Sequence, residues 1–435
     1  MSILSSQSLL EILATYPCRR YILAYSGGVD SHVLLHCLAK LQQMGKIQPF
    51  RVIHINHGLQ TVAKTWGQHC QKIANELNVS CEVVNLNLSP QKGESLEAIA
   101  RTGRYQVFSQ QLKNHEILLT AHHQNDQAET VLLQLFRGSG VDGLAAMPAI
   151  RAFHKGQLLR PLLHYSRDCI MEYAQQHQLD YIDDPSNRDT DFDRNFLRHE
   201  VLPLLQTRWK GIHATLSRVA YLQSEAKNLL AEYTQVDLDQ ALNPTKNTLY
   251  IEQLKTFTSQ KQKAVIRLWL QQQSYPMPSA IKLQHILSDA LYAKQAATPC
   301  VHWQNIEVRA YQKQLYVMPR LDKHNTEQVI VWKTITEDLF IPSLKQYIMA
   351  SVVQKWFTTH QIEVKQNKVS VRFRQGGERI QLVGHKHHSR LKKLLQTANI
   401  PPWQRDRIPL IYFDNRLIMI YPDWSAEYES IGKNI

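Results

Sequence analysis

A six-residue segment, Ser26-Gly27-Gly28-Val29-Asp30-Ser31, combines residues that suit the binding of a polyphosphate. It follows an apolar run, Tyr21–Tyr25, and leads into a helical apolar pattern over residues 31–43. A strand, a glycine turn and a helix start bring backbone N–H groups and the positive end of a helix dipole to one point, where anions bind. The segment therefore predicts a phosphate-binding loop. A glycine turn between any strand and helix is the simpler alternative.

Asp30 indicates what kind of phosphate chemistry this loop would serve. A carboxylate beside a polyphosphate is repulsive unless it holds Mg²⁺ or positions a hydroxyl group. The glycines are not followed by the Gly-Lys-Ser/Thr of a Walker loop. We therefore expect a nucleotide site of another type, with Asp30 as the residue that could help to bind Mg²⁺.

Two further carboxylates, Asp126 and Glu129, are three residues apart in a segment that opens a helix after a strand-like run. At this spacing they share one face of the helix. Such a pair can hold Mg²⁺ or receive an ammonium group. An Asp N-cap followed by a capping-box Glu explains the same residues without any function. Their position just after a strand favours the functional interpretation.

Arginine pairs occur twice in the first half of the chain. Arg101 and Arg104 share one face of a helix expected over residues 94–113, where they could neutralise phosphate. Arg194 and Arg198 lie one turn apart at the start of a later helix. Judged alone, Arg101 and Arg104 are more typical of a solvated surface pair, and Arg194 and Arg198 of a capped helix after an Asp/Asn/Pro turn.

The end of the chain is basic. Residues 351–435 contain 14 Lys and Arg against 7 Asp and Glu, which is more than half of the excess positive charge of the chain. Lys392 and Lys393 begin an amphipathic helical pattern, and Arg405 follows Trp403. Basic groups near an aromatic side chain suit a surface that follows a nucleic-acid backbone and stacks a base. A solvated basic face is the alternative.

Composition limits the class of protein. The chain has 435 residues, 43% of them hydrophobic, and a formal charge of +13 from 50 Lys and Arg against 37 Asp and Glu. This excess favours a polyanionic partner. No apolar run is long enough for a transmembrane helix, so we expect no membrane partner. The six cysteines include no Cys-x-x-Cys pair, which is typical of a reduced, cytoplasmic protein.

The elements that must position these residues alternate along the first half of the chain. Strand-like runs at 21–25, 51–56, 82–86 and 116–121 are separated by helical patterns. This order predicts an α/β fold with a parallel, doubly wound sheet, whose crevice lies beyond the carboxyl ends of its strands. We expect a catalytic domain over residues 1–205, a helical linker and substrate-binding middle domain over 206–330, and a basic, nucleic-acid-binding α+β domain over 351–435.

Taken together and in order, these segments resemble the tRNA(Ile)-lysidine synthetase family of N-type, PP-loop ATP pyrophosphatases. The resemblance is strong over residues 1–205 and 370–410 and weak between them. The matching segments are Ser26–Ser31, His54–Leu59, Ala100–Tyr105, His122–Thr130, Arg137–Leu144, Arg160–Leu163, Asp184–Asn187, Arg194–Arg198, Arg372–Arg379 and Leu391–Arg407.

The resemblance implies a two-step ligation. ATP adenylates the C2 carbonyl oxygen of the wobble cytidine in a tRNA(Ile) with a CAU anticodon, and pyrophosphate is released. The ε-amine of free L-lysine then displaces AMP to form lysidine. The modified tRNA decodes AUA instead of AUG and is charged with isoleucine instead of methionine.

The resemblance also implies residue roles. Ser26, Gly27, Gly28, Val29, Asp30 and Ser31 would bind ATP, with Asp30 assisting Mg²⁺. Asp126 and Glu129 would hold lysine or the metal. The candidates for contacts to ATP or tRNA phosphates are Arg101, Arg104, Arg198, Lys392, Lys393 and Arg405.

Three other functions compete with this one. A tRNA thiolase would usually carry paired cysteines, and a glutamine-dependent amidotransferase needs a cysteine at its start, where this chain has Met1-Ser2. An RNA-binding module that only senses nucleotide, without catalysis, is the alternative from a different class. The oligomeric state is left open, although the resemblance is compatible with a homodimer.

Overall fold

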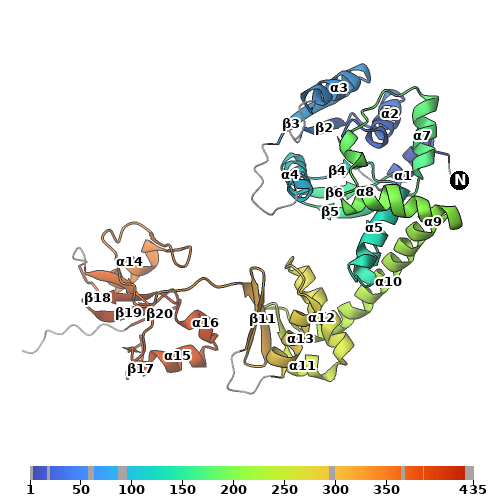
Figure 1. Ribbon diagram of the computed structural model, residues 1–435. Coiled ribbons are helices and arrows are strands. Elements are labelled where there is room, and N and C mark those ends of the chain that lie inside the picture. Colours follow the sequence, from blue (N-terminus) through green and yellow to red (C-terminus); the bar gives the residue numbers. More distant parts are fainter. Residues whose placement is uncertain are drawn as a thin grey trace, which may run out of the picture. The chain divides into compact units, whose positions relative to one another are not determined.

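A computed structural model describes residues 3–16, 20–56, 63–86, 96–292, 299–363, 368–385 and 387–426. The chain divides into two compact units, Met1–Glu232 and Tyr233–Ile435. Figure 1 shows the elements of each unit. None of the helices in these ranges is both long enough and apolar enough to cross a membrane.

The first unit is built on a six-stranded sheet in the order β3-β2-β1-β4-β6-β5. All neighbouring strands are parallel except β5, which is antiparallel to β6. The predicted parallel α/β fold is confirmed, and the β5–β6 hairpin adds an edge that the sequence patterns did not indicate. The strands are β1 (Arg20–Ala24), β2 (Arg51–Asn56), β3 (Ser80–Asn85), β4 (Glu116–Leu119), β5 (Ile150–Phe153) and β6 (Gly156–Leu159).

Helices cover both faces of this sheet, as a doubly wound fold requires (Figure 1). They are α1 (Ser6–Ala14), α2 (Val29–Gln43), α3 (Ala63–Glu76), α4 (Leu96–Gln111), α5 (Gln124–Phe136), α6 (Val141–Leu144) and α7 (Arg167–Gln176). The chain continues through η1 (Pro185–Arg188), α8 (Asp193–Phe196), η2 (Leu197–Val201), α9 (Leu202–Arg208) and the long α10 (Ile212–Ala241).

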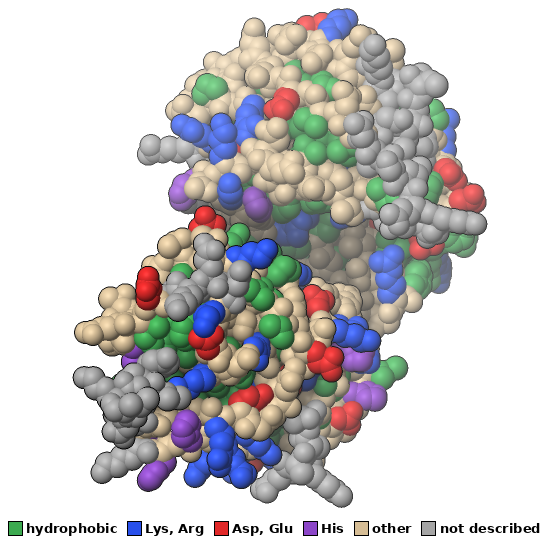
Figure 2. All heavy atoms as spheres, turned by 90° about the vertical axis from the view of Figure 1, so that its left-hand side faces the viewer, with side chains coloured by type: hydrophobic (Ala, Val, Ile, Leu, Met, Phe, Trp, Pro, Cys, Tyr) green, Lys and Arg blue, Asp and Glu red, His purple; other side chains and the backbone are tan. Residues whose placement is uncertain are grey.

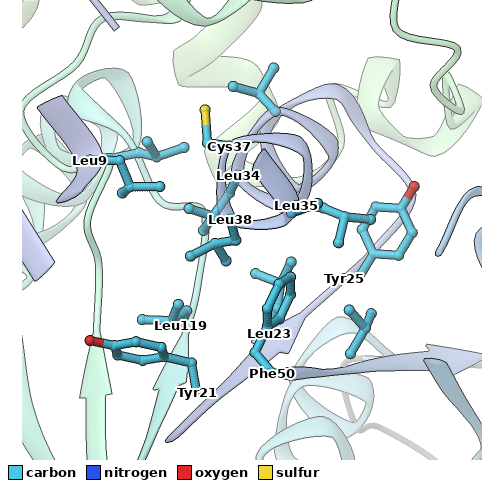
Figure 3. Packing of buried hydrophobic residues seen from close by; sticks show 14 of the residues in the cluster. Leu9, Tyr21, Leu23, Tyr25, Leu34, Leu35, Cys37, Leu38, Phe50 and Leu119 are labelled. Carbon is cyan, nitrogen blue, oxygen red and sulfur yellow. The ribbon is translucent and has the colours of Figure 1, made fainter. Parts of the chain in front are cut away.

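The alternation of side chains along each strand produces two hydrophobic clusters. Leu23 and Leu119 point to the face that is covered by α1, α2 and α7, where they pack with Leu34 and Leu38 (Figure 3). Ile22 and its neighbours Ile53, Leu118 and Leu158 point to the opposite face, where they pack with Phe108 of α4. Packing on both faces holds the strands in place, and with them the starting points of the loops that follow their carboxyl ends.

The second unit contains two further five-stranded sheets. The first, in the order β7-β8-β11-β10-β9, packs on helices around Trp269. Its elements are β7 (Leu242–Asn243), β8 (Thr248–Tyr250), β9 (Cys300–Trp303), β10 (Ile306–Tyr311), β11 (Gln314–Pro319), α11 (Ile251–Thr256), α12 (Ser259–Gln272), α13 (Ala280–His285) and η3 (Ile286–Leu291).

The other sheet has the order β12-β15-β18-β19-β20. The sequence pattern predicts only an irregular connection over residues 321–350. In the structure, β12 pairs with β15, so this sheet begins upstream of residue 351. A two-residue strand carries no periodic signal, so the sequence could not reveal it. The elements are β12 (Ile330–Val331), β13 (Leu339–Ile341), β14 (Gln346–Ile348), α14 (Ala350–Thr359), β15 (Val369–Arg372), β16 (Arg379–Ile380), β17 (Ser389–Arg390), α15 (Leu391–Thr397), α16 (Pro402–Arg405), β18 (Leu410–Phe413), β19 (Arg416–Ile420) and β20 (Trp424–Ser425).

Gly156 at the start of β6 provides a test of this packing. A Cβ atom there would overlap the backbone oxygen of Glu116 and lie 3.0 Å from Cδ2 of Leu112. We expect Gly156→Ala to lower the free energy of unfolding of the first unit by about 1–3 kcal/mol, as overpacking of a core does. Urea unfolding followed by circular dichroism measures the change.

Gly211→Ala is the matched control, because a Cβ atom on Gly211 would meet nothing within 4 Å. Equal unfolding midpoints for the two variants would contradict the packing described for the β5–β6 hairpin.

Candidate active site

The glycine loop connects β1 to α2 at the carboxyl edge of the sheet. Gly27 has a φ of +88°, in the left-handed region that favours glycine. A Cβ atom on Gly27 would lie 2.5 Å from Cδ1 of Ile182 and 3.0 Å from Sγ of Cys70. The N–H of Ile182 also donates to the oxygen of Gly27, at 3.0 Å. The loop therefore depends on glycine at this position.

The two serines of the loop stabilise its shape. The Ser31 hydroxyl donates to the backbone oxygen of Gly28 at 2.9 Å and accepts from the N–H of Ser26 at 3.2 Å. The two serine Oγ atoms are 3.0 Å apart. These contacts fix the loop at the N-terminus of α2, a position where helices commonly bind phosphate.

Asp30, in the first turn of α2, is paired with an arginine that sequence reasoning missed. Nη1 of Arg167 lies 2.6 and 2.5 Å from the two carboxylate oxygens. The N–H of Arg167 also donates to the side-chain oxygen of Asn125, at 3.1 Å. Arg167 begins α7, 137 residues after Asp30, and a lone arginine at a helix start gives no sequence signal of such a contact.

His123 connects Asp30 to the second pair of carboxylates. Its Nε2 lies 3.6 Å from Oδ1 of Asp30 and 3.4 Å from Oδ2 of Asp126. The imidazole is buried. The loops after β1 and β4 therefore bring Asp30 and Asp126 to one place, as the rule for parallel sheets predicts.

Asp126 and Glu129 lie on one buried face of α5 and bind two arginines. Nη2 of Arg194 is 2.7 Å from Asp126, and its Nε is 2.6 Å from Glu129. Nη2 of Arg198 is 3.1 Å from Asp126, and its Nε is 2.6 Å from Glu129. Each guanidinium thus bridges both carboxylates. Arg198, predicted to contact phosphate, is engaged here with the carboxylates instead.

These charges shift the protonation of the cluster. Burial alone would raise the pKa of Asp126, but its interactions with His123 and Arg194 lower it well below its usual range. Burial likewise opposes the charge of Arg198, whereas its hydrogen bond to Glu129 raises the pKa of the guanidinium. Asp126 and Arg198 therefore carry opposite charges in the physiological pH range.

The helix-start explanation of these residues is only partly correct. His123, and not Asp126, is the N-cap residue of α5. Asp126 stands at the third helical position, where its Oδ2 accepts from the N–H of His123 at 2.9 Å. The same carboxylate thus satisfies an N-terminal amide with one oxygen and binds the arginines with the other.

The remaining predicted residues lie elsewhere. Arg101 and Arg104 are exposed on α4, and Lys392 and Lys393 are exposed on α15 of the second unit. Figure 2 shows Lys and Arg side chains in several groups on the visible face of that unit, separated by acidic and apolar side chains. Arg405 is only 9% exposed.

Arg405 differs from the role predicted for it. Its Nε donates to the oxygen of Ile400 and its Nη2 to the hydroxyl of Tyr311, each at 2.8 Å. Two of its five N–H donors are used inside the protein and the side chain is nearly buried, so this guanidinium packs α16 against β10 instead of lying open to a phosphate.

The side chains around the loop include the carboxylate oxygens that Mg²⁺ prefers as ligands. In the part of the chain that the structure describes, no three His, Cys, Asp or Glu side chains converge as a ready-made metal cage. Mg²⁺ at nucleotide sites usually takes one or two carboxylates and completes its shell with water and phosphate oxygens. Asp30 and Asp126, which both contact His123, supply hard oxygen donors of that type.

Comparisons with known proteins match this arrangement. Family models described as PP-loop domain, TilS substrate binding domain and TilS substrate C-terminal domain match residues 1–205, 249–316 and 369–430. A tRNA(Ile)-lysidine synthase from Coxiella burnetii is 41% identical over 96% of this chain and 92% of its own. The chain belongs to the tRNA(Ile)-lysidine synthase family.

The chain is also similar to tRNA(Ile)-lysidine synthases from other bacteria. One from Legionella pneumophila (strain Paris) is 37% identical, and one from Yersinia pseudotuberculosis is 40% identical; each match covers 92% of this chain and 90% of the relative. Among solved structures, U34-tRNA thiolase NcsA from Methanococcus maripaludis matches 50% of this chain and 77% of its own at 15% identity, with a TM-score of 0.42. We draw nothing from that likeness.

The candidate site contains three residues whose contacts the sequence did not reveal: His123, Arg167 and Arg194. The sequence places Arg194 one helical turn before Arg198, but this spacing does not identify the partners of Arg194. A spacing of four residues shows that two arginines share a face, whereas only the folded chain shows that this face meets α5.

His122 gives the site a measurable pH dependence. Burial and the charges of Arg160 and Arg194 lower its pKa to about 3, against the opposing charge of Asp126. Between this value and about 6.5, the unfolded chain binds a proton that the folded chain does not. Acid should therefore destabilise the first unit below about pH 6.5, by up to about 1.4 kcal/mol per pH unit from this group.

We expect His122→Asn to flatten this dependence. Urea unfolding at pH 7.0 and pH 5.0 should show a smaller loss of free energy for the variant than for the natural chain. Identical losses would contradict the lowered pKa of His122.

Proposed function

We propose that this chain joins free L-lysine to C2 of the wobble cytidine in tRNA(Ile) with a CAU anticodon, and converts ATP to AMP and pyrophosphate. One observation carries the proposal. In a lysidine-synthase chain, a phosphate-binding loop at the carboxyl end of β1 lies beside a buried carboxylate pair, at the carboxyl end of β4, that already holds two cations. The first feature suits ATP, and the second suits an amine substrate.

The loop serves the first step. Its backbone N–H groups and serine hydroxyls bind the phosphates of ATP, and the start of α2 stabilises the negative charge that develops on pyrophosphate. Mg²⁺, when bound by Asp30 and Asp126, would neutralise further charge on these phosphates. Adenylation converts the C2 oxygen of cytidine, otherwise a poor leaving group, into one that departs with AMP.

Asp126 and Glu129 serve the second step by holding lysine. Both carboxylates are buried and lie against guanidinium groups, and the ammonium group of lysine is also a cation that donates hydrogen bonds to carboxylates. To admit lysine, one of the arginine contacts must be given up. The attacking ε-amine must be neutral, so its proton leaves before the new C–N bond forms. We assign no residue as the base.

The other parts of the chain would bring the tRNA to this site. We propose catalysis by residues 1–205, substrate binding by 206–330, and tRNA binding by 351–435. Lys392 and Lys393 are exposed for contacts to RNA phosphates, as are Arg101 and Arg104 in the first unit. Because its substrate is a tRNA, we also expect this protein to act in the cytoplasm. The homodimer stays a prediction, which light scattering of the purified chain would test.

Lysine transfer tests the proposed function directly. The full chain is incubated with ATP, Mg²⁺, radiolabelled lysine and unmodified tRNA(Ile), and label in the tRNA is measured. We expect label to appear with this tRNA and to be absent when the wobble cytidine is replaced by uridine. Asp30→Ala should abolish AMP formation while the fold is retained. Tight tRNA binding without lysine transfer would instead favour an RNA-binding module.

Glu129→Gln tests the lysine site. The variant removes one carboxylate charge from the cluster, so we expect the KM for lysine to rise about tenfold or more, with a smaller effect on the KM for ATP. Glu225→Gln, on the exposed face of α10, is the matched control. An unchanged KM for lysine in Glu129→Gln would remove this carboxylate from the substrate site.

A further inference from the structure

Arg160, directly after β6, is a buried cation with unused hydrogen-bonding capacity. The side chain is only 5% exposed. Its Nη1 donates to the backbone oxygen of Pro148 at 2.7 Å, but its Nε has no partner among the described residues. A buried donor without a partner costs about 1–3 kcal/mol, so such groups usually mark a missing ligand or water.

Two more arginines gather beside Arg160 around the ring of Tyr105. The guanidinium carbon of Arg101 lies 5.3 Å from the ring centre, and that of Arg151 lies 5.8 Å from it. Arg101 comes from α4 and Arg151 from β5, two elements that lie side by side in Figure 1. The ring also packs on Phe153 of β5, at 5.8 Å between centres, which fixes this arrangement.

The three arginines carry a charge that the surrounding protein does not balance. Across the described ranges, none of them has a carboxylate within ion-pair distance, although most other arginines near the crevice do. Burial lowers the pKa of Arg160, the Tyr105 phenol opposes this, and the charges of Arg151 and Arg101 lower it further. An anion placed between these groups would relieve both the repulsion and the unpaired Nε.

We propose that Arg101, Arg151 and Arg160 form a binding site for a phosphate group of a substrate, separate from the glycine loop. Guanidinium groups bind phosphate through paired N–H donors, and three of them match a charged group with several free oxygens. The inference rests on the proposed function for its two sources of phosphate, a tRNA phosphodiester or ATP.

The site lies next to the reaction centre. His122, which follows β4, interacts electrostatically with Arg160 and Arg101 on one side and with Asp126 and Arg194 on the other. A phosphate bound here would therefore be held close to the carboxylates that receive lysine. The loop after β6 contributes Arg160 as the loops after β1 and β4 contribute Asp30 and Asp126, which places all of them at the carboxyl edge of the sheet.

Arg151→Glu tests the site without disturbing the core, because Arg151 is exposed on an edge strand. Dissociation constants of the full chain are measured for unmodified tRNA(Ile) and for a non-hydrolysable ATP analogue, each over a range of salt concentrations. Lys155→Glu is the matched control, because it reverses the same charge at an exposed position of the same hairpin. Arg160→Lys is measured in parallel, with thermal unfolding as a check of its fold.

If the phosphate belongs to tRNA, Arg151→Glu should weaken tRNA binding about tenfold and reduce the salt slope by about one, with ATP-analogue binding unchanged. If it belongs to ATP, the analogue should bind about tenfold more weakly, with tRNA binding unchanged. Lys155→Glu should have little effect in either case. Either result supports the site, and the difference between them shows whether tRNA or ATP supplies the phosphate.

Three results would overturn the proposal. They are unchanged binding of both ligands by Arg151→Glu, equal losses in Arg151→Glu and Lys155→Glu, or a rise in the KM for lysine alone. The first two are binding measurements and do not depend on whether lysine is transferred. Failure of the proposed function would appear instead as the absence of labelled tRNA with the natural chain.

Discussion

The active region depends on one ionic arrangement, in which the carboxylates of Asp126 and Glu129 each bind both Arg194 and Arg198. Glu129 is 1% exposed, so its charge is stable only because these cations accompany it. The arrangement joins α5, which follows the sheet, to the segment that leads into the long helix α10. Under the proposed function, these two carboxylates are also the ones that receive the substrate amine.

The same edge of the sheet separates charges of opposite sign. Asp30, Asp126 and Glu129 place carboxylates in one region, whereas Arg101, Arg151 and Arg160 place guanidinium groups in a neighbouring one. An enzyme that joins an amine to a polyanion has to bind a positively charged and a negatively charged substrate at separate sites, so that they do not simply pair with each other. The loops after β1, β4 and β6 provide this separation because parallel strands deliver their ends to a common edge.

Much of this could be predicted from the sequence because the signals are local. Alternating apolar runs and helical periods predicted the parallel α/β fold, and the ordered motifs from Ser26 to Arg407 indicated the lysidine-synthase family; both are confirmed. The roles of the individual site residues and the domain boundaries stay predictions. Arg405 illustrates the limit, since a basic residue near Trp403 suggested an RNA contact and is instead packed against Tyr311.

By itself the sequence determined the phosphate loop, the carboxylate pair and the basic end of the chain, because each is a pattern of neighbours within one element. Only the tertiary structure decided that Arg167 binds Asp30 across 137 residues, that Arg194 and Arg198 bind α5, and that Arg160 is buried with an unused donor. Those contacts join segments that are remote in sequence, and the charge of an arginine does not specify its partner. The packing of the sheet and its helices does.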